Sequence, residues 1–375
     1  MSETITKTES TAAQDIKKIL IIRLSSLGDI LFALPSLEAL RKAFPDADIS
    51  WVVEDRFASV LENHPHIDEL IVMPRRQWKG RGLGALSPAW HFLRELGRRG
   101  FDLTIDFQGN LKSGMASLFA RAPLRLGFAR SECHEPNWLF TNRRRSLNGA
   151  IMHRIDRDLA LLSLIGIDAE YEPPSLHISD QDTQLAAEFI ASLRGRGPLI
   201  VLQPGTSEWG RNKRWASRSF AALGDALCKD HDARVVVNWG SKSEKRTANE
   251  LVASMTHEAT VALPTENLLA LGAFLKQADL LVGCDSGPAH LASLLGTKVV
   301  TLFGPTDPRL YHPWGHPDHA IYEALPCSPC RYRNCVGRAC LSRISVERVQ
   351  ATCDAILRNE SPPPASIEPN KTITL

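Results

Sequence analysis

The stretch Leu193-Arg-Gly-Arg-Gly-Pro-Leu-Ile-Val-Leu-Gln203 decides how this chain is organised. Its glycines and proline interrupt the preceding helical pattern, and an apolar run rich in β-forming residues follows at once. From there, short apolar segments alternate with helical or loop segments, the apolar ones lying at 234–238, 259–263, 280–284 and 299–303. We therefore expect a second domain to begin at about residue 196.

The part of the chain before this junction shows the same alternation. Its apolar runs lie at 19–24, 49–53, 70–73 and 103–107. Strands that are apolar throughout and separated by helices are typical of parallel sheets covered on both faces. The sequence thus predicts an α/β protein of two doubly wound, parallel-sheet domains, residues 17–195 and 196–358. Ligands of such sheets bind beyond the carboxyl ends of the strands, so the loops after strands carry the functional argument.

The composition is that of an ordinary globular protein, with 375 residues of which 43% are hydrophobic and 23% charged. Fibrous and wholly disordered classes are excluded, because no fixed-period repeat or low-complexity tract occurs. No apolar run approaches the ~20 residues of a bilayer span, which favours a cytoplasmic protein. The polar segment 1–16 and the segment 359–375 are expected to be disordered tails.

Basic residues gather in one part of the first half. Between residues 70 and 130, Lys and Arg number 11 and Asp and Glu number 3, so the local balance is 11 − 3 = +8. Such a surface either attracts phosphates or simply keeps a helix face soluble. No RNA-binding aromatic motif or helix-turn-helix pattern accompanies it, so we expect no nucleic-acid partner.

The first loop with candidate chemistry is Ile21-Ile-Arg-Leu-Ser-Ser-Leu-Gly-Asp29, which runs from a strand into a helix. Gly28 lets the backbone come close to a ligand, and Asp29 presents a carboxylate at the strand end. Asp29 is either a helix N-cap or a catalytic base, and the frequency of Asp at caps favours the cap. Pro35 is expected to limit the regularity of the helix near its start.

The second loop is Leu202-Gln-Pro-Gly-Thr-Ser-Glu-Trp-Gly-Arg-Asn-Lys-Arg-Trp215. It superficially resembles the phosphate loop of nucleoside triphosphatases, but Arg211 and Asn212 stand where that loop needs Lys and Ser or Thr. The hydroxyls of Thr206 and Ser207 and the cation Lys213 remain, which suit a diphosphate without requiring a metal.

The third loop joins an apolar strand to a helix in Leu280-Leu-Val-Gly-Cys-Asp-Ser-Gly-Pro-Ala-His290. Free amides at a helix N-terminus attract anions, and Ser286 and Gly287 lie where a diphosphate could meet them. The alternative is a structural cap formed by Asp285 or Ser286, with His290 an ordinary helix residue.

Four of the eight cysteines crowd between Cys327 and Cys340, at Cys327, Cys330, Cys335 and Cys340. Four thiols could bind zinc or an iron–sulfur cluster, but their spacing matches no standard finger. Reduced thiols or a conditional disulfide are the alternatives. Whether they hold a metal is left open.

Taken together, these segments resemble glycosyltransferase family 9, the lipopolysaccharide heptosyltransferases. Arg23-Leu-Ser-Ser-Leu-Gly-Asp29 is similar to the family's opening motif, and Asp106-Phe-Gln-Gly-Asn-Leu-Lys112 to a second one. Asp285-Ser-Gly-Pro-Ala-His290, followed by Phe303-Gly-Pro-Thr-Asp-Pro308, is similar to its donor-site signature. The resemblance runs from about residue 17 to 358 and implies the GT-B fold, with two Rossmann-like domains facing a central cleft.

The resemblance also implies roles for individual residues. Asp29 becomes the base of an inverting transfer that needs no metal or other cofactor, and Lys213 offsets charge on the leaving diphosphate. The implied donor residues are Thr206, Ser207, Lys213, Glu244, Asp285, Ser286, Gly287 and His290. The implied acceptor residues are Ser26, Gly28, Arg75, Arg76, Lys79 and Lys112.

The implied substrates are a nucleotide-sugar donor, ADP-heptose, and a phosphorylated, lipid-linked saccharide acceptor, which brings peripheral contact with the inner membrane. Two positions depart from the family pattern. Glu266 stands where the family has an apolar residue that contacts the adenine base of the donor nucleotide. His134 stands where the family has an arginine on the acceptor side. The other classes are a GT-B nucleotide-sugar 2-epimerase and a catalytically silent binding protein at the membrane surface.

Overall fold

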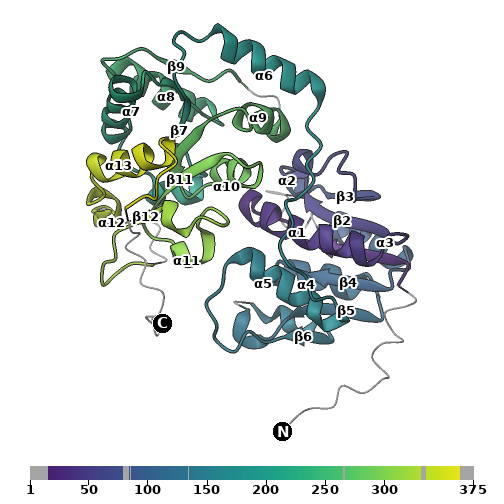
Figure 1. Cartoon of the computed structure of the whole chain (residues 1–375). Helices are drawn as coiled ribbons and strands as arrows, with labels where there is room; N and C mark the ends of the chain where they lie inside the picture. Colours follow the sequence, from purple (N-terminus) through teal and green to yellow (C-terminus); the bar gives the residue numbers. More distant parts are fainter. Residues whose placement is uncertain are drawn as a thin grey trace. The chain divides into compact units, whose positions relative to one another are not determined.

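The chain folds into two compact units, residues 1–177 and 178–375 (Figure 1). The computed structural model describes residues 16–78, 84, 86–133, 135–264, 267–330 and 335–363. The division lies N-terminal to the expected boundary at 195/196. The reason is helix α6 (Asp180–Ser192), which packs on α9 (Leu268–Leu275) of the second unit, with the rings of Phe189 and Phe274 5.7 Å apart.

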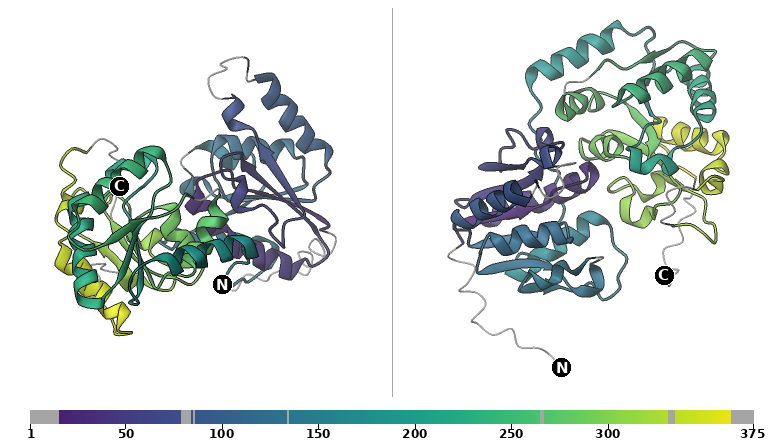
Figure 2. Two further views of the ribbon diagram at one scale, coloured as in Figure 1. Left: turned by 90° about the horizontal axis from the view of Figure 1, so that it is seen from above. Right: turned by 180° about the vertical axis from the view of Figure 1, so that it is seen from behind.

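The first unit is a six-stranded parallel sheet in the order β3-β2-β1-β4-β5-β6. Its strands are β1 (Lys18–Ile22), β2 (Asp48–Glu54), β3 (Glu69–Met73), β4 (Leu103–Asp106), β5 (Leu124–Phe128) and β6 (Arg143–Arg145). Its α-helices are α1 (Leu27–Ala43), α2 (Arg75–Trp78), α3 (Leu86–Arg98), α4 (Leu111–Phe119) and α5 (Arg154–Leu161). Helices α1 and α5 pack together, and α3 packs against α4 (Figure 2).

The second unit repeats this design in the order β12-β11-β10-β7-β8-β9, again with every pairing parallel. Its strands are β7 (Leu199–Gln203), β8 (Arg234–Val237), β9 (Ala259–Val261), β10 (Leu280–Cys284), β11 (Lys298–Phe303) and β12 (Ala320–Tyr322). Its other helices are α7 (Ser217–His231), α8 (Lys242–Ser254), α10 (Gly287–Leu294), α11 (Pro308–Tyr311), α12 (Ala339–Ser342) and α13 (Val346–Leu357). The prediction of two doubly wound parallel sheets is confirmed.

Burial explains why the strands are apolar along their whole length. All five residues of β7 and all five of β10 are buried, because helices cover both faces of the sheet. Each fully buried Leu, Ile or Val contributes about 1.5–3 kcal/mol relative to an exposed one. Helix α1 runs without interruption through Pro35, contrary to expectation. Ten of its residues, Pro35 among them, are buried, so tertiary packing outweighs the local cost of the proline.

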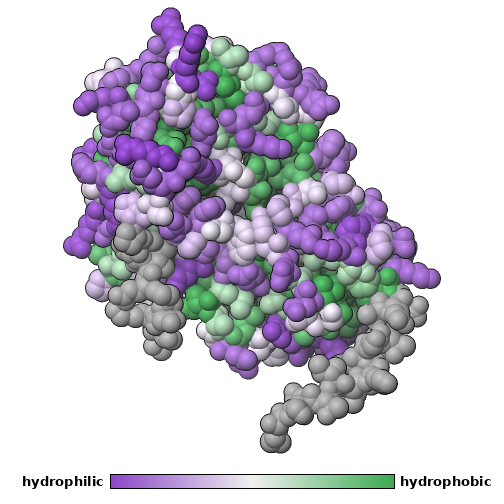
Figure 3. All heavy atoms as spheres, in the orientation of Figure 1, coloured by the Kyte–Doolittle hydropathy of each residue, from purple (hydrophilic) through white to green (hydrophobic). Residues whose placement is uncertain are grey.

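The outer surface is mixed in polarity. In the space-filling view polar residues cover most of the visible face, with apolar residues in patches among them (Figure 3). Within the described residues, none of the helices combines the length and the apolar character needed to cross a bilayer.

One buried histidine makes the stability of the first unit depend on pH. His64 is only 4% exposed; its burial, followed by the charge of nearby His66, lowers its pKa to about 4. The unfolded chain, with a His pKa near 6.5, therefore binds more protons between pH 6.5 and 4. The free energy of unfolding should keep the full contribution of neutral His64 above pH 6.5. It should fall by about 3 kcal/mol as the pH is lowered to 4. Urea unfolding at pH 7 and 4.5 measures this, and a His64→Gln protein with an equally large drop would contradict it.

Candidate active site

Asp29 lies in the first turn of α1, at the carboxyl end of β1. The helix is capped by Ser26, so Asp29 is at the third helical position and not at the N-cap itself. Its Oδ2 accepts hydrogen bonds from the Ser26 backbone N (3.2 Å) and Oγ (2.8 Å). Its Oδ1 pairs with the Arg23 guanidinium at 2.8 Å. The carboxylate thus stabilises the helix start, and its side chain is still 29% exposed to solvent.

The charges around Asp29 keep it ionised. Burial alone would raise the pKa of this carboxyl group, but Arg23, then Arg154, and hydrogen bonds from Ser26 outweigh it and lower the pKa below its usual range. A carboxylate that is ionised at neutral pH can accept a proton from a hydroxyl group that attacks as it is deprotonated. Each carboxylate oxygen has two lone pairs, so these contacts leave acceptor capacity.

The segment Asp106–Lys112 holds the Asp29 loop in place. Gln108 Oε1 accepts hydrogen bonds from the backbone N of Leu24 (3.0 Å) and of Ser25 (3.1 Å), and Arg23 donates to the Phe107 carbonyl. Sequence reasoning noted this motif only as a family resemblance. The signal that was missed is a polar side chain, Gln108, two residues after the end of β4, the strand that neighbours β1 in the sheet.

Asp106 fixes the start of the segment Asp106–Lys112 through buried hydrogen bonds. Its carboxylate is fully buried and accepts hydrogen bonds from Ser113 Oγ and Asn137 Nδ2, both at 2.8 Å. Burial raises its pKa, although these bonds and two backbone amides, of Gln108 and Gly109, oppose the shift. Asp106 therefore has a structural role in the first unit, whereas the Asp29 carboxylate keeps access to solvent.

The expected acceptor residues lie in the same unit. Ser26 is exposed and Gly28 half-buried beside Asp29, and Arg75 and Arg76 are exposed in α2. Lys112, at the start of α4, pairs with Glu54 at the end of β2, with Nζ and Oε1 3.3 Å apart. Lys79 lies outside the described residues, as do His134 and Glu266. The acceptor role of these residues stays a prediction.

The centre of the second loop cluster is Asp285, at the carboxyl end of β10. The Lys213 Nζ lies 2.7 Å from its Oδ2, and the His290 Nε2 lies 3.0 Å from its Oδ1. Burial alone would raise the pKa of Asp285, but Lys213 and then His290 hold it well below its usual range. The two expected donor loops, 202–215 and 280–290, are therefore joined by an ion pair within the second unit.

Two hydroxyl groups at this sheet edge have no hydrogen-bond partner in the described part of the chain. They are the Ser286 Oγ, at the N-cap of α10, and the Thr306 Oγ1, in the loop after β11. Buried polar groups nearly always find a partner, and one without a partner requires an explanation. Gly287 starts α10, whose free amides add partial positive charge. An anionic ligand at this edge is one partner that such hydroxyl groups could take.

Arg214 was missed by sequence reasoning and organises the rest of the donor loops. Its Nε donates to Thr206 Oγ1 (3.1 Å), and its NH2 lies 3.6 Å from Glu244 Oε1. Thr206 Oγ1 also donates to the Gly210 carbonyl (2.8 Å), whereas Ser207 is exposed. Thr206 and Glu244 thus lie in one cluster, and the backbone of Gly205 lies so close to Glu244 that a Cβ there would come within 2.6 Å of Glu244 Oε1 unless that side chain shifted.

The segment that carries the four clustered cysteines contacts the loop after β11 and the loop 202–215. Cys330 N donates to the Pro305 carbonyl (2.8 Å), and Arg338 NH1 to the Arg214 carbonyl (3.3 Å). All eight cysteines are unpaired thiols. Residues 331–334 lie outside the description, and among the residues it covers the four clustered cysteines do not form a group with their sulfur atoms close enough to share one metal ion.

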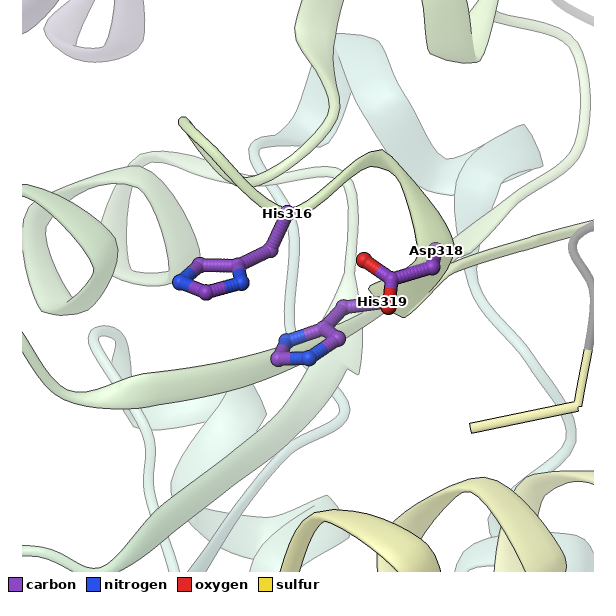
Figure 4. A group of neighbouring side chains, drawn as sticks. All are labelled: His316, Asp318 and His319. Atoms are coloured by element: carbon purple, nitrogen blue, oxygen red, sulfur yellow. The ribbon is translucent and has the colours of Figure 1, made fainter. Parts of the chain in front are cut away.

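A different group of three potential ligands does come together before β12. Ligand atoms of His316, Asp318 and His319 lie within 4.8 Å of one another (Figure 4). However, the two imidazole rings are stacked, with 13° between their planes and centroids 4.5 Å apart. The nitrogen lone pairs lie in the ring planes, so stacked rings do not direct them at one ion. The group lies at the amino end of β12, whereas the loops 202–215 and 280–290 lie at the carboxyl ends of β7 and β10 in the same sheet.

Comparisons with known proteins agree with these motifs. A model of glycosyltransferase family 9 (heptosyltransferase) matches residues 89–340. Lipopolysaccharide heptosyltransferase 1 of Pseudomonas aeruginosa is 28% identical over 358 residues, 91% of this chain and 98% of that protein.

Solved structures show the same similarity. A family 9 glycosyltransferase from Veillonella parvula has a TM-score of 0.78 and 26% identity, and the match covers 92% of this chain and 98% of that one. The E. coli heptosyltransferase WaaC with ADP has a TM-score of 0.70 and 25% identity, covering 90% and 99%. These matches confirm the GT-B fold predicted from the sequence.

Proposed function

Because this chain belongs to glycosyltransferase family 9 and is a glycosyltransferase, we propose that it transfers a heptose from ADP-heptose to the inner core of lipopolysaccharide. The relatives that match over most of the chain are named as lipopolysaccharide heptosyltransferases, and one of the solved structures is of a heptosyltransferase with ADP. The observation in this chain that carries the proposal is the Lys213–Asp285–His290 chain at the N-terminus of α10, beside the unpartnered Ser286 hydroxyl. That arrangement suits the diphosphate of the donor.

The proposed reaction is a direct displacement with inversion. The acceptor oxygen forms a bond to the anomeric carbon as the bond from that carbon to the diphosphate oxygen breaks. Asp29 takes the hydroxyl proton, and the diphosphate leaves with the electron pair. Lys213 and the amides at the start of α10 offset the charge that develops on the leaving oxygen. Thr206, Ser207 and Glu244 hold the rest of the nucleotide.

The acceptor is proposed to be a phosphorylated saccharide linked to a lipid. The exposed Arg75 and Arg76 and the half-exposed Lys112 lie in the unit that carries Asp29, and guanidinium and ammonium groups bind phosphate well. Such a substrate places the enzyme in the cytoplasm, in peripheral contact with the inner membrane. Membership of a transferase family favours this function over the 2-epimerase and over a silent binding protein.

The transfer is expected to need no divalent metal. Lys213 and the helix N-terminus supply the positive charge at the donor site, and Asp285 already pairs with Lys213 and His290. Activity should persist in excess EDTA at an unchanged rate. Loss of activity in EDTA and its recovery with magnesium would show that the diphosphate is held by a metal.

The function itself is tested by incubating the protein with ADP-heptose and a heptose-free lipid A–Kdo acceptor. We expect the acceptor mass to rise by one heptose residue, with release of ADP. A matched reaction with UDP-N-acetylglucosamine, read for epimerised sugar, tests the epimerase alternative. Epimerisation without transfer would contradict the proposal.

A further inference from the structure

Helices α3 and α4 of the first unit present apolar side chains to solvent. On α4 the exposed residues Leu111, Met115 and Leu118, each 41% exposed, follow helical spacing and form one stripe. On α3 the exposed Trp90 is 57% accessible, and its ring packs edge-on against Phe119 at 5.1 Å. These contacts join the stripe and Trp90 into one surface, here called the α3–α4 surface.

Arginines surround the aromatic part of this surface. A cavity of about 340 Å³ opens there, lined by Trp90, Arg94, Gly97, Arg98, Phe119 and Arg121. Arg98 pairs with Glu95, whereas no carboxylate of the described residues forms an ion pair with Arg94 or Arg121. The surface therefore combines exposed apolar groups with unneutralised positive charge.

The α3–α4 surface is continuous with the expected acceptor residues. Helix α4 begins with Leu111 and Lys112, directly after the segment that anchors the Asp29 loop. Helix α2, which carries Arg75 and Arg76, packs on α3 through the rings of Trp78 and Phe92, 5.9 Å apart. A lipid-linked saccharide held at these residues would bring its bilayer to α3 and α4.

We propose that the α3–α4 surface docks on an anionic bilayer, with Trp90 and the α4 stripe entering the headgroup region and Arg94 and Arg121 meeting lipid phosphates. Tryptophan is enriched at membrane–water interfaces because its ring is apolar and its N–H is polar. Helices with an apolar face beside basic side chains bind anionic membranes in the interface plane. The inference rests on the proposed lipid-linked acceptor and adds where the protein meets the membrane.

The test measures flotation of the full chain with phosphatidylethanolamine–phosphatidylglycerol vesicles, and with phosphatidylcholine vesicles for comparison. Each basic residue near an anionic surface contributes about fivefold to binding. Arg94→Glu/Arg121→Glu should therefore weaken binding to the anionic vesicles at least about 25-fold. Adding Trp90→Ala to this double variant should weaken vesicle binding further. The charge-matched control Arg194→Glu/Arg196→Glu, at exposed positions of the second unit, should bind like the wild type.

A second readout separates this inference from the proposed function. Transfer to a deacylated, water-soluble acceptor should be unchanged in the surface variants, whereas transfer to a vesicle-embedded acceptor should show a raised KM. Wild-type protein that floats but transfers to neither acceptor would overturn the function and leave the surface standing. Equal flotation of wild type and both surface variants would overturn the surface proposal. So would dimers in solution that the same substitutions dissociate, because the surface would then join two copies of the chain.

Discussion

Replacing Asp29 with Asn should lower kcat by about 10²–10⁴-fold, the range typical of losing a general base. The amide cannot take the proton of the acceptor hydroxyl, yet it has nearly the same shape and can still accept the hydrogen bonds from Ser26. Donor affinity should be unchanged, because the residues proposed to bind the donor lie in the second unit. Steady-state kinetics and ADP titration calorimetry measure the two quantities.

The same substitution also weakens a helix start and an ion pair with Arg23, so stability needs its own control. Ser345→Ala removes an N-cap hydrogen bond from α13, which lies outside both loop clusters. We expect it to lower the Tm by about as much as Asp29→Asn and to leave kcat alone. A low Tm with full turnover in Asp29→Asn would reduce Asp29 to a capping residue.

Replacing Lys213 with Ala should cost about 2–4 kcal/mol of transition-state stabilisation, comparable to the loss of one oxyanion donor. That is roughly a 30- to 1,000-fold fall in kcat/KM. The physical reason is twofold, because Lys213 faces the expected diphosphate and also neutralises the buried Asp285. Arg211→Ala is the matched control, since Arg211 is a cation of the same loop that is 68% exposed and pairs with Glu208.

A double variant separates the two roles of Lys213. In Lys213→Ala/Asp285→Asn, the buried carboxylate that Lys213 neutralises is itself removed. Stability should recover relative to Lys213→Ala, while kcat/KM should stay low because the charge on the leaving group is still not offset. Recovery of both would show that Lys213 acts only by neutralising Asp285.

The parallel sheets were predictable because burial on both faces leaves a continuous apolar run, as in Leu199–Gln203 and Leu280–Cys284. The boundary at 195/196 was misplaced for a related reason. Periodicity identifies α6 as a helix, but only its contacts with α9 show which unit it joins. Glycine and proline after α6 indicate a chain turn, and a turn occurs within domains as well as between them.

The candidate site was predictable where a polar residue lies in the connection after a buried strand, as Asp285 does directly after β10 and Asp29 does in the first turn of the helix after β1. Its supporting contacts were not, because they join residues far apart in sequence. Gln108 holds backbone amides 83 and 84 residues away, and Lys213 reaches an aspartate 72 residues away. Arg214 gave no motif signal because its partners come from separate elements, Thr206 from the loop after β7 and Glu244 from the first turn of α8.

The most direct test of the account is the anomeric configuration of the product, measured by NMR on the saccharide made from ADP-heptose by the wild-type protein. In a displacement assisted by Asp29 as the base, the acceptor oxygen attacks the anomeric carbon on the face opposite to the leaving diphosphate. The new bond therefore forms as the old one breaks. The account therefore predicts a single product whose anomeric configuration is inverted relative to the donor. A product with retained configuration would contradict it, since retention requires a second displacement or another mechanism in which Asp29 is not the base.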